Sequence, residues 1–293
     1  MNKFLVRTLS GAVYVALVLL AIYSYALIES RKVGYVLFAA FFLFVAIVGV
    51  YEVYHNLRVK DVETHRTMGY IVAVLTYGVV SLSNVCGTAL ALRLLIVLPV
   101  MWSLVPLSQL WHHDERPFAS IGYTLLPTLW VVLPLALLQR LWIMNPLVAL
   151  MMFLCIWVND TFAYLTGMAF GKHRMWQRHS PNKTWEGTAG GAICCMAAAV
   201  GVGMWLYRPD CFYGGQLQWW HWVVMGLICS VVGTLGDLVE SMFKRSCGVK
   251  DSGTIMPGHG GVLDRFDSLL MATPWVVAFF MVCQMVERVT GLL

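Results

Sequence analysis

Residues 9–28 read LSGAVYVALVLLAIYSYALI, an apolar run that contains no charged side chain. A helix rises 1.5 Å per residue, so about 20 such residues cross the roughly 30 Å of hydrocarbon in a bilayer. A cleaved signal peptide would have a shorter apolar region, about 7 to 15 residues, and a small-residue cleavage site. We therefore interpret this run as a transmembrane helix.

The same pattern recurs along the whole chain. Hydrophobic residues make up 59% of the 293 residues and charged residues only 12%, roughly half the share of charge in soluble domains. With a mean hydropathy of +0.73, the chain has too little polar surface for a soluble enzyme. We predict an all-α polytopic membrane protein with about nine transmembrane helices. These are expected at roughly 9–28, 34–54, 68–83, 87–106, 119–138, 146–168, 188–207, 220–243 and 269–290.

The Lys and Arg residues predict the orientation, because cytoplasmic loops of membrane proteins carry an excess of both. With nine spans and the N-terminus in the cytoplasm, most of the 20 Lys and Arg residues fall on the cytoplasmic side. Two polar loops, 170–187 and 244–267, then face the cytoplasm as well. We predict one integral membrane domain, 1–293, in which the N-terminal transmembrane helices of 1–145 precede catalytic helices in 146–293 that carry both loops.

Two other classes of protein are disfavoured by composition. The eight Cys residues are scattered, without a C-x-x-C motif or a finger-like pairing with His, so neither a disulfide framework nor a zinc site is expected. Basic and aromatic residues do not form a combined run, so no nucleic acid partner is expected.

The first candidate for chemistry is TLGDLVESMFKRS, residues 234–246, near the end of the eighth predicted span. Asp237, Glu240, Ser241 and Lys244 are spaced so that they share one helical face. A carboxylate inside a span costs at least about 2.5 kcal/mol, and two neighbouring acids repel unless a cation or proton lies between them. The alternative is an ion pair of Lys244 with one of these acids that merely joins helices.

The loop KRSCGVKDSGTIMPGHGGVLDRFD, residues 244–267, interleaves acids and bases around a glycine-rich turn just before the ninth predicted span. Polyphosphate needs cationic donors, its divalent metal needs hard oxygen ligands, and a helix N-terminus favours anions. We predict that Asp237 and Asp264 hold Mg²⁺. The basic residues expected on phosphate oxygens are Lys244, Arg245, Lys250 and Arg265. The alternative is a plain helix start, with Asp264 as the cap and Asp267 favouring the helix dipole.

The other polar loop contains HSPNKTWEG, residues 179–187. Its candidates for substrate contact are Ser180, Lys183, Thr184 and Glu186. An ordinary helix cap, formed by Thr184 with an acid in the first turn, explains part of this pattern equally well.

Three further polar residues lie inside predicted spans. Asn159 and Asp160 belong to NDTFAY, residues 159–164. Asp160 has no cation on its own helix, so both a buried structural hydrogen bond and a ligand role remain open. Glu52, late in the second predicted span, is interpreted as an interfacial residue.

The segment 241–267 closely resembles the defining motif of CDP-diacylglycerol synthases (phosphatidate cytidylyltransferases). Met256 departs from the branched or aromatic residue expected there, a change that affects no catalytic group. Segments 159–164 and 180–187 also resemble this family, so the likeness covers about 159–268. The matching positions of the motif are Ser241, Lys244, Arg245, Lys250, Asp251, Gly253, Pro257, His259, Gly260, Gly261, Asp264, Arg265 and Asp267.

The resemblance implies a dimeric membrane enzyme that joins CTP and the membrane lipid phosphatidic acid into CDP-diacylglycerol and pyrophosphate, with Mg²⁺, in phospholipid biosynthesis. A second cation is left open. It would lie in the cell membrane, the inner one if the source has two, with its active site on the cytoplasmic face. The expected catalytic residues are Asp237, Lys244, Lys250, Asp264 and Asp267. The expected substrate-binding residues are Asn159, Asp160, Ser180, Lys183, Thr184, Glu186, Ser241, Arg245, Asp251, His259, Gly260, Gly261 and Arg265.

The residues are compatible with that chemistry. A phosphate monoester has a second pKa of about 6, so the attacking lipid phosphate is already largely anionic and needs no strong base. Catalysis then consists of placing two anions and neutralising their repulsion. A carrier whose intramembrane acids form an ion path also fits the composition, as does a structural membrane protein, but neither explains the motif in a loop. The D-G-x-x-A-R motif of CDP-alcohol transferases is absent.

Overall fold

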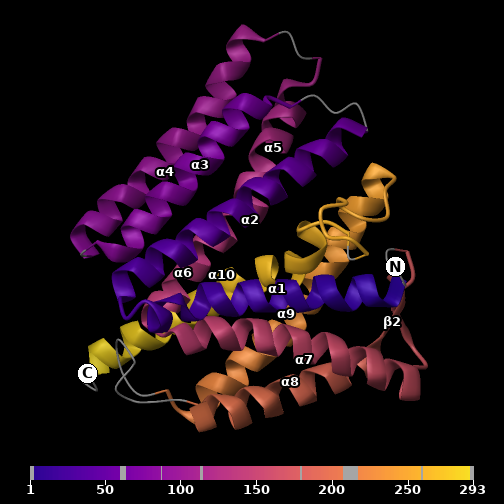
Figure 1. The fold of residues 1–293 in the computed structure, drawn as a ribbon. Coiled ribbons are helices and arrows are strands. Elements are labelled where there is room, and N and C mark those ends of the chain that lie inside the picture. The colour runs from indigo at the N-terminus through magenta and orange to yellow at the C-terminus, as the bar shows by residue number, and fades with distance from the viewer. Residues whose placement is uncertain are drawn as a thin grey trace. The chain divides into compact units, whose positions relative to one another are not determined.

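The computed structural model describes residues 3–59, 64–86, 88–112, 115–178, 180–206, 217–258 and 260–290 (Figure 1). Within these ranges the regular secondary structure is helical apart from one short hairpin and one isolated bridge. The hairpin pairs the antiparallel strands β1 (Arg174–Trp176) and β2 (Ser180–Thr184). The N-terminal helices are α1 (Lys3–Leu27), α2 (Arg31–Val59), α3 (Arg66–Val85), α4 (Thr88–Ser108), α5 (Pro117–Pro127) and α6 (Leu133–Met144). The others are α7 (Pro146–Phe170), α8 (Trp185–Leu206), α9 (Trp219–Cys247) and α10 (Leu263–Thr290).

Two short elements complete the described part. A 3₁₀ turn, η1 (Gln109–Trp111), follows α4, and a π-helical turn, η2 (Thr128–Val132), joins α5 to α6. The π turn follows Pro127, which lacks the N–H that an α-helix needs at that position. The helical path nevertheless continues, so that Pro117–Met144 forms one candidate span.

Nine helical segments in the described ranges are long and apolar enough to cross a membrane. This confirms the prediction of an all-α, multi-pass membrane protein. Several helices exceed their predicted runs. The second span, for example, covers Arg31–Arg58 instead of 34–54, because polar residues at a helix end can continue the helix beyond its apolar run.

The chain divides into two compact units. The first unit contains Met1–Gln139 and Lys244–Arg265, and the second contains Arg140–Phe243 and Phe266–Leu293. The glycine-rich loop before α10 therefore belongs with the N-terminal helices. The predicted subdivision at residue 145 stays a prediction.

In the first unit α1 contacts α2, and α3 packs along α4 (Figure 1). Large apolar side chains of α2, including Phe38 and Phe42, are fully buried. Tyr54 of the same helix is also buried, and its hydroxyl donates to the carbonyl oxygen of Thr124 in α5 at 2.7 Å. This bond satisfies a polar group that apolar packing alone would leave without a partner.

In the second unit α7 and α8 lie side by side (Figure 1). The start of α7 is fixed by Asn145, whose side chain accepts from the Leu147 amide at 2.8 Å, with proline as the first helical residue. Small residues let the helices approach closely: a Cβ on Gly191 would lie 2.8 Å from the carbonyl oxygen of Asn159. This close approach brings the polar residues of α7 next to the start of α8.

Candidate functional site

The hairpin and α9 meet through an ion pair in the second unit. Lys183 of β2 places its Nζ 2.6 Å from Asp237 Oδ2 and also donates to the carbonyl oxygen of Thr234 at 3.2 Å. Both charged side chains are partly exposed, 24% for the lysine and 34% for the aspartate. Two polar segments that are far apart in the sequence thus form one polar centre.

A cavity of about 600 Å³ opens beside this ion pair. Five of the residues predicted from the sequence line it: Asn159, Asp160, Lys183, Thr184 and Asp237. Sequence reasoning missed Tyr164, Arg174, Asn182, Thr188 and Thr234, which also line it. The volume suits a ligand of nucleotide size, since small-molecule sites commonly span about 300–1,000 Å³.

Asn159 and Asp160 have different surroundings at this cavity. Asn159 is 2% exposed, and its Nδ2 donates to Thr234 Oγ1 at 3.3 Å. Asp160 is exposed and lines the cavity. The structure therefore excludes a buried structural role for Asp160, whose Oδ1 accepts from Asn159 Nδ2 at 3.5 Å. Its role as a ligand stays a prediction.

Two residues of the hairpin segment serve the start of α8. Thr184 Oγ1 accepts from the amide of Gly187 at 3.2 Å, which makes it the helix cap. Glu186 accepts from the amides of Lys172 and His173 and from His173 Nδ1. The capping interpretation is thus confirmed for Thr184, which lines the cavity as well. Neither Glu186 nor Ser180 contributes to the cavity wall, and their substrate contacts stay predictions.

Three carboxylates cluster in the second unit. Asp237, Glu240 and Asp267 each bring one oxygen within 4.8 Å of the others. Glu240 is fully buried, and Ser241 next to it donates to Asp237 Oδ1 at 3.4 Å. Hard carboxylate oxygens from two helices are the donors that a magnesium ion prefers. The donor set therefore fits this metal.

The first unit contains a second ion pair. Lys244 Nζ lies 2.5 Å from Asp264 Oδ1, and the two side chains are only 13% and 6% exposed. Lys244 therefore pairs with Asp264, and the alternative of an ion pair with an acid on its own helix stays open. Asp264 Oδ2 accepts from the Ser252 amide and hydroxyl at 2.8 and 2.9 Å and from the Gly261 amide at 2.8 Å.

These contacts define what Asp264 does. It is the second residue of α10, so it does not occupy the cap position itself. Its Oδ2 closes the glycine-rich loop onto the first turn of the helix, and its Oδ1 faces the lysine. Asp264 and Asp237 belong to different units, and their sharing of one metal ion stays a prediction.

Glu52 holds the same loop from α2. This carboxylate is 1% exposed and accepts from the amides of Val262 and Leu263, both at 2.8 Å, and from the Ser252 hydroxyl at 3.0 Å. One turn later, Asn56 Nδ2 donates to the carbonyl oxygen of Ser252 at 2.9 Å. Glu52 is thus a buried carboxylate that accepts hydrogen bonds from the N-terminus of α10, and its position near the membrane interface stays a prediction.

Glycines allow this contact. A Cβ on Gly253 would lie 2.5 Å from Glu52 Oε1, and one on Gly261 would lie 2.5 Å from Glu52 Oε2. The signal in the sequence was the pair of Glu52 and Asn56, whose four-residue spacing puts two polar groups on one face of an apolar helix.

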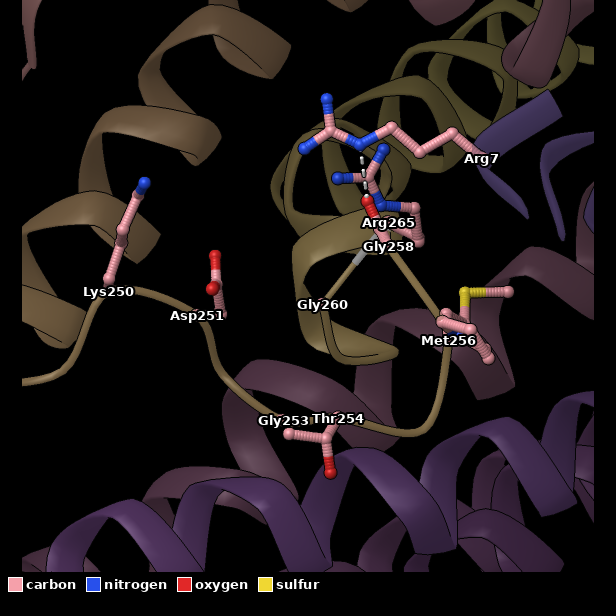
Figure 2. Close-up of a pocket in the computed structure, with 10 residues that line it drawn as sticks. Arg7, Lys250, Asp251, Gly253, Thr254, Met256, Gly258, Gly260 and Arg265 are labelled. Carbon is pink, nitrogen blue, oxygen red and sulfur yellow. Dashed lines mark hydrogen bonds between the residues drawn. The ribbon is translucent and has the colours of Figure 1, made fainter. Parts of the chain in front are cut away.

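The loop surrounds a second cavity, of about 540 Å³ (Figure 2). Gly258 and Gly260 bend the loop with φ angles of 77° and 83°, values that only glycine adopts readily. Of the predicted residues, Lys250, Asp251, Gly260 and Arg265 line this cavity.

Three other predicted residues have different positions. Arg245 is exposed and donates to the carbonyl oxygen of Val249 at 3.4 Å. Gly261 is buried and donates to Asp264. His259 lies outside the described residues.

The N-terminal helix also contributes to this cavity. Arg7 lines it, and its Nε donates to the carbonyl oxygen of Gly258 at 3.0 Å. Ser10 donates to the carbonyl oxygen of Pro257 at 3.0 Å. Sequence reasoning used Arg7 only as evidence of orientation, because a single arginine before an apolar run carries no other signal.

Comparison with known proteins agrees with these observations. The chain is 48% identical over 122 residues to a protein of Staphylococcus haemolyticus named phosphatidate cytidylyltransferase, a match that covers 42% of this chain and 44% of the relative. The protein of the same name from Staphylococcus aureus (strain COL) is 49% identical over 124 residues, with the same coverage. The matched segment thus spans less than half of the length of these relatives. The model of the cytidylyltransferase family matches residues 6–283, and the chain therefore belongs to that family.

Proposed function

We propose that the protein is a phosphatidate cytidylyltransferase, which converts CTP and phosphatidic acid into CDP-diacylglycerol and pyrophosphate in phospholipid biosynthesis. The observation that carries the proposal is the cavity of the second unit, where Lys183 and Asp237 meet beside Asp160. It belongs to a multi-pass membrane protein of the cytidylyltransferase family. The names of the Staphylococcus relatives support the same activity.

The reaction needs little acid–base chemistry. A phosphate oxygen of the lipid attacks the α-phosphorus of CTP, a new P–O bond forms, and the bond to the β-phosphate breaks. Pyrophosphate leaves with the electron pair of that bond. Since the lipid phosphate is already anionic, the chain must mainly orient both phosphates and reduce their mutual repulsion.

In this proposal the cavity of the second unit binds the nucleotide. Lys183 faces the triphosphate, and its contact with Asp237 holds the ammonium group in place before the substrate arrives. Asn159 and Thr234 supply neutral hydrogen-bonding groups to the same wall. Such preorganised donors need not reorganise when negative charge develops.

Mg²⁺ dependence belongs to the same proposal. The carboxylates of Asp237, Glu240 and Asp267 are suited to hold the ion. Asp264, the other ligand predicted from the sequence, accepts from Lys244 at Oδ1 and accepts three hydrogen bonds at Oδ2, and its role as a ligand stays a prediction. When bound, the ion would neutralise triphosphate charge. The proposal leaves a second cation open.

Location and assembly are inferred from the sequence and the resemblance. We propose that the protein lies in the cell membrane, the inner one where there are two, with the N-terminus and both polar loops in the cytoplasm. The excess of Lys and Arg in those loops supports this orientation. A homodimer is proposed from the family resemblance alone.

The proposed function is tested by pyrophosphate release from detergent-purified protein. Release should require CTP, phosphatidic acid and Mg²⁺ together. It should be lost in Asp237→Asn, which removes the partner of Lys183 and one metal ligand, but kept in Glu29→Gln, an exposed carboxylate outside the site. Pyrophosphate release without phosphatidic acid would mean nucleotide hydrolysis instead. No release at all from folded protein would favour the carrier.

A further inference from the structure

The cavity of the glycine-rich loop has a charge that the proposed nucleotide site does not explain. Its wall carries three cationic side chains, Arg7, Lys250 and Arg265, and one carboxylate, Asp251 (Figure 2). Three cationic side chains and one anionic side chain give the cavity wall a net charge of +2. A phosphate monoester carries about −1.5 to −2 at neutral pH, so the two charges match.

These cations differ from the two lysines of the ion pairs. Lys183 and Lys244 are each neutralised by an aspartate. Considering only the residues that the structure describes, no carboxylate forms an ion pair with Arg7, Lys250 or Arg265. Cations that are gathered in one cavity without such partners repel each other, and an anionic ligand relieves this repulsion.

The position of Arg7 indicates which phosphate binds here. Arg7, Ser10 and Tyr14 share the face of α1 that contacts the loop, through the carbonyl oxygens of Gly258, Pro257 and Arg265 respectively. The cavity is thus attached to a candidate membrane span, Leu5–Leu27. A ligand bound by Arg7 has its charged end beside a helix that is suited to lie in lipid.

Another face of α1 is apolar and exposed. Leu5, Leu9, Val13 and Leu17 are 48%, 50%, 57% and 45% exposed. Their spacing of four residues keeps them on one stripe, which lies roughly 60–160° around the helix from Arg7 and Tyr14. The helix that carries Arg7 thus also offers apolar surface, which acyl chains can contact and a nucleoside triphosphate cannot use.

We propose that this cavity binds the phosphate monoester head of phosphatidic acid, with Arg7, Lys250 and Arg265 as its cationic contacts. This inference rests on the proposed cytidylyl transfer. Gly258 and Gly260 line the same cavity. Phosphatidic acid and CTP then have separate binding cavities, one in each unit.

The kinetic test separates the two substrates. In detergent micelles with saturating CTP, Arg7→Gln and Lys250→Gln should each raise the half-saturating mole fraction of phosphatidic acid about tenfold or more, as expected for losing one charged hydrogen bond. The KM for CTP should change by less than about twofold, since the nucleotide lies elsewhere. Arg58→Gln is the matched control, because Arg58 is exposed in α2 of the same unit and outside the cavity.

Comparing the two variants distinguishes a loss of loop structure from the loss of a direct contact with the lipid. Arg7 also holds the loop through Gly258, whereas Lys250 has no hydrogen bond to another described residue. If only Arg7→Gln weakens phosphatidic acid, the effect comes from the loop and the proposed site is wrong. A rise in the KM for CTP in both variants would also overturn it, because the cavity would then hold triphosphate.

A binding measurement distinguishes lipid from free phosphate and does not depend on turnover. Calorimetry without CTP should detect dioctanoyl phosphatidic acid but not dioctanoylglycerol, and Arg7→Gln should weaken this binding. Inorganic phosphate or pyrophosphate binding as tightly as the lipid, with the same dependence on Arg7, would overturn the lipid assignment.

The two proposals can fail separately. Lipid binding that depends on Arg7, without formation of CDP-diacylglycerol, would refute the proposed transferase activity and support the proposed lipid site. Transferase activity that is unaffected by both substitutions would refute the site alone.

Discussion

Replacing Glu52 by glutamine tests how the glycine-rich loop is held. Glutamine keeps the size of the side chain but turns one carboxylate oxygen into an amino group. Oε2 accepts from both the Leu263 amide and the Ser252 hydroxyl, and Oε1 accepts from the Val262 amide. In the better orientation, the glutamine oxygen keeps the two Oε2 contacts, and its amino group faces the Val262 amide.

The size of the effect follows from that loss. A hydrogen bond to a charged group contributes about 1.5–3 kcal/mol, and an unsatisfied buried N–H costs about 1–3 kcal/mol. The negative charge near the start of α10 contributes roughly 0.3–2 kcal/mol more. Because the first two figures partly describe the same loss, we expect local destabilisation of about 3 kcal/mol.

Hydrogen–deuterium exchange measures this local opening directly. A change of about 3 kcal/mol corresponds to roughly hundredfold faster exchange in a peptide that contains Val262 and Leu263. Glu29→Gln removes an equal charge from an exposed side chain of the same unit and should leave that exchange unchanged. Equal protection of this peptide in Glu52→Gln and the unmodified protein would refute the role given to Glu52.

Three further predictions concern the loop and the hairpin. Asp264→Asn should lower transferase activity at least about hundredfold, because the substitution removes the carboxylate that pairs with a buried lysine. Membrane insertion should persist, since no apolar span changes. Activity near that of the unmodified protein would show that the Asp264 carboxylate is not essential. Gly261→Ala should lower the thermal midpoint, since its Cβ would meet buried oxygens, whereas Gly122→Ala, with open space around it, should not; equal midpoints would contradict the close packing. Thr184→Val should cost about 1 kcal/mol of unfolding free energy by removing the cap bond to Gly187, and an unchanged value would show that the cap is dispensable.

The fold was predictable because its signal is local. Each span is a continuous apolar run, and the boundaries that differ do so where polar residues extend a helix, as at Arg31 and Cys247. The cap at Thr184 was also a local pattern, read from the acid in the turn that follows. Short-range reasoning fails where the partner lies far along the chain.

The site shows this limit clearly. Lys244 has an acid on its own helical face, but it also pairs with Asp264 in the next helix. Glu52 binds amides 210 and 211 positions away, and Arg7 contacts a carbonyl 251 positions away. No spacing rule connects residues so distant, because these contacts depend on how the helices pack.

The most direct test of the proposed function follows radiolabelled CTP into lipid. Detergent-purified protein is incubated with CTP labelled in the cytosine ring, phosphatidic acid and Mg²⁺, and the label is then measured in the organic phase. The proposal predicts lipid-soluble label that comigrates with CDP-diacylglycerol, requires all three components and disappears in Asp237→Asn. Label that stays in the aqueous phase, from protein shown to be folded, would contradict the proposal.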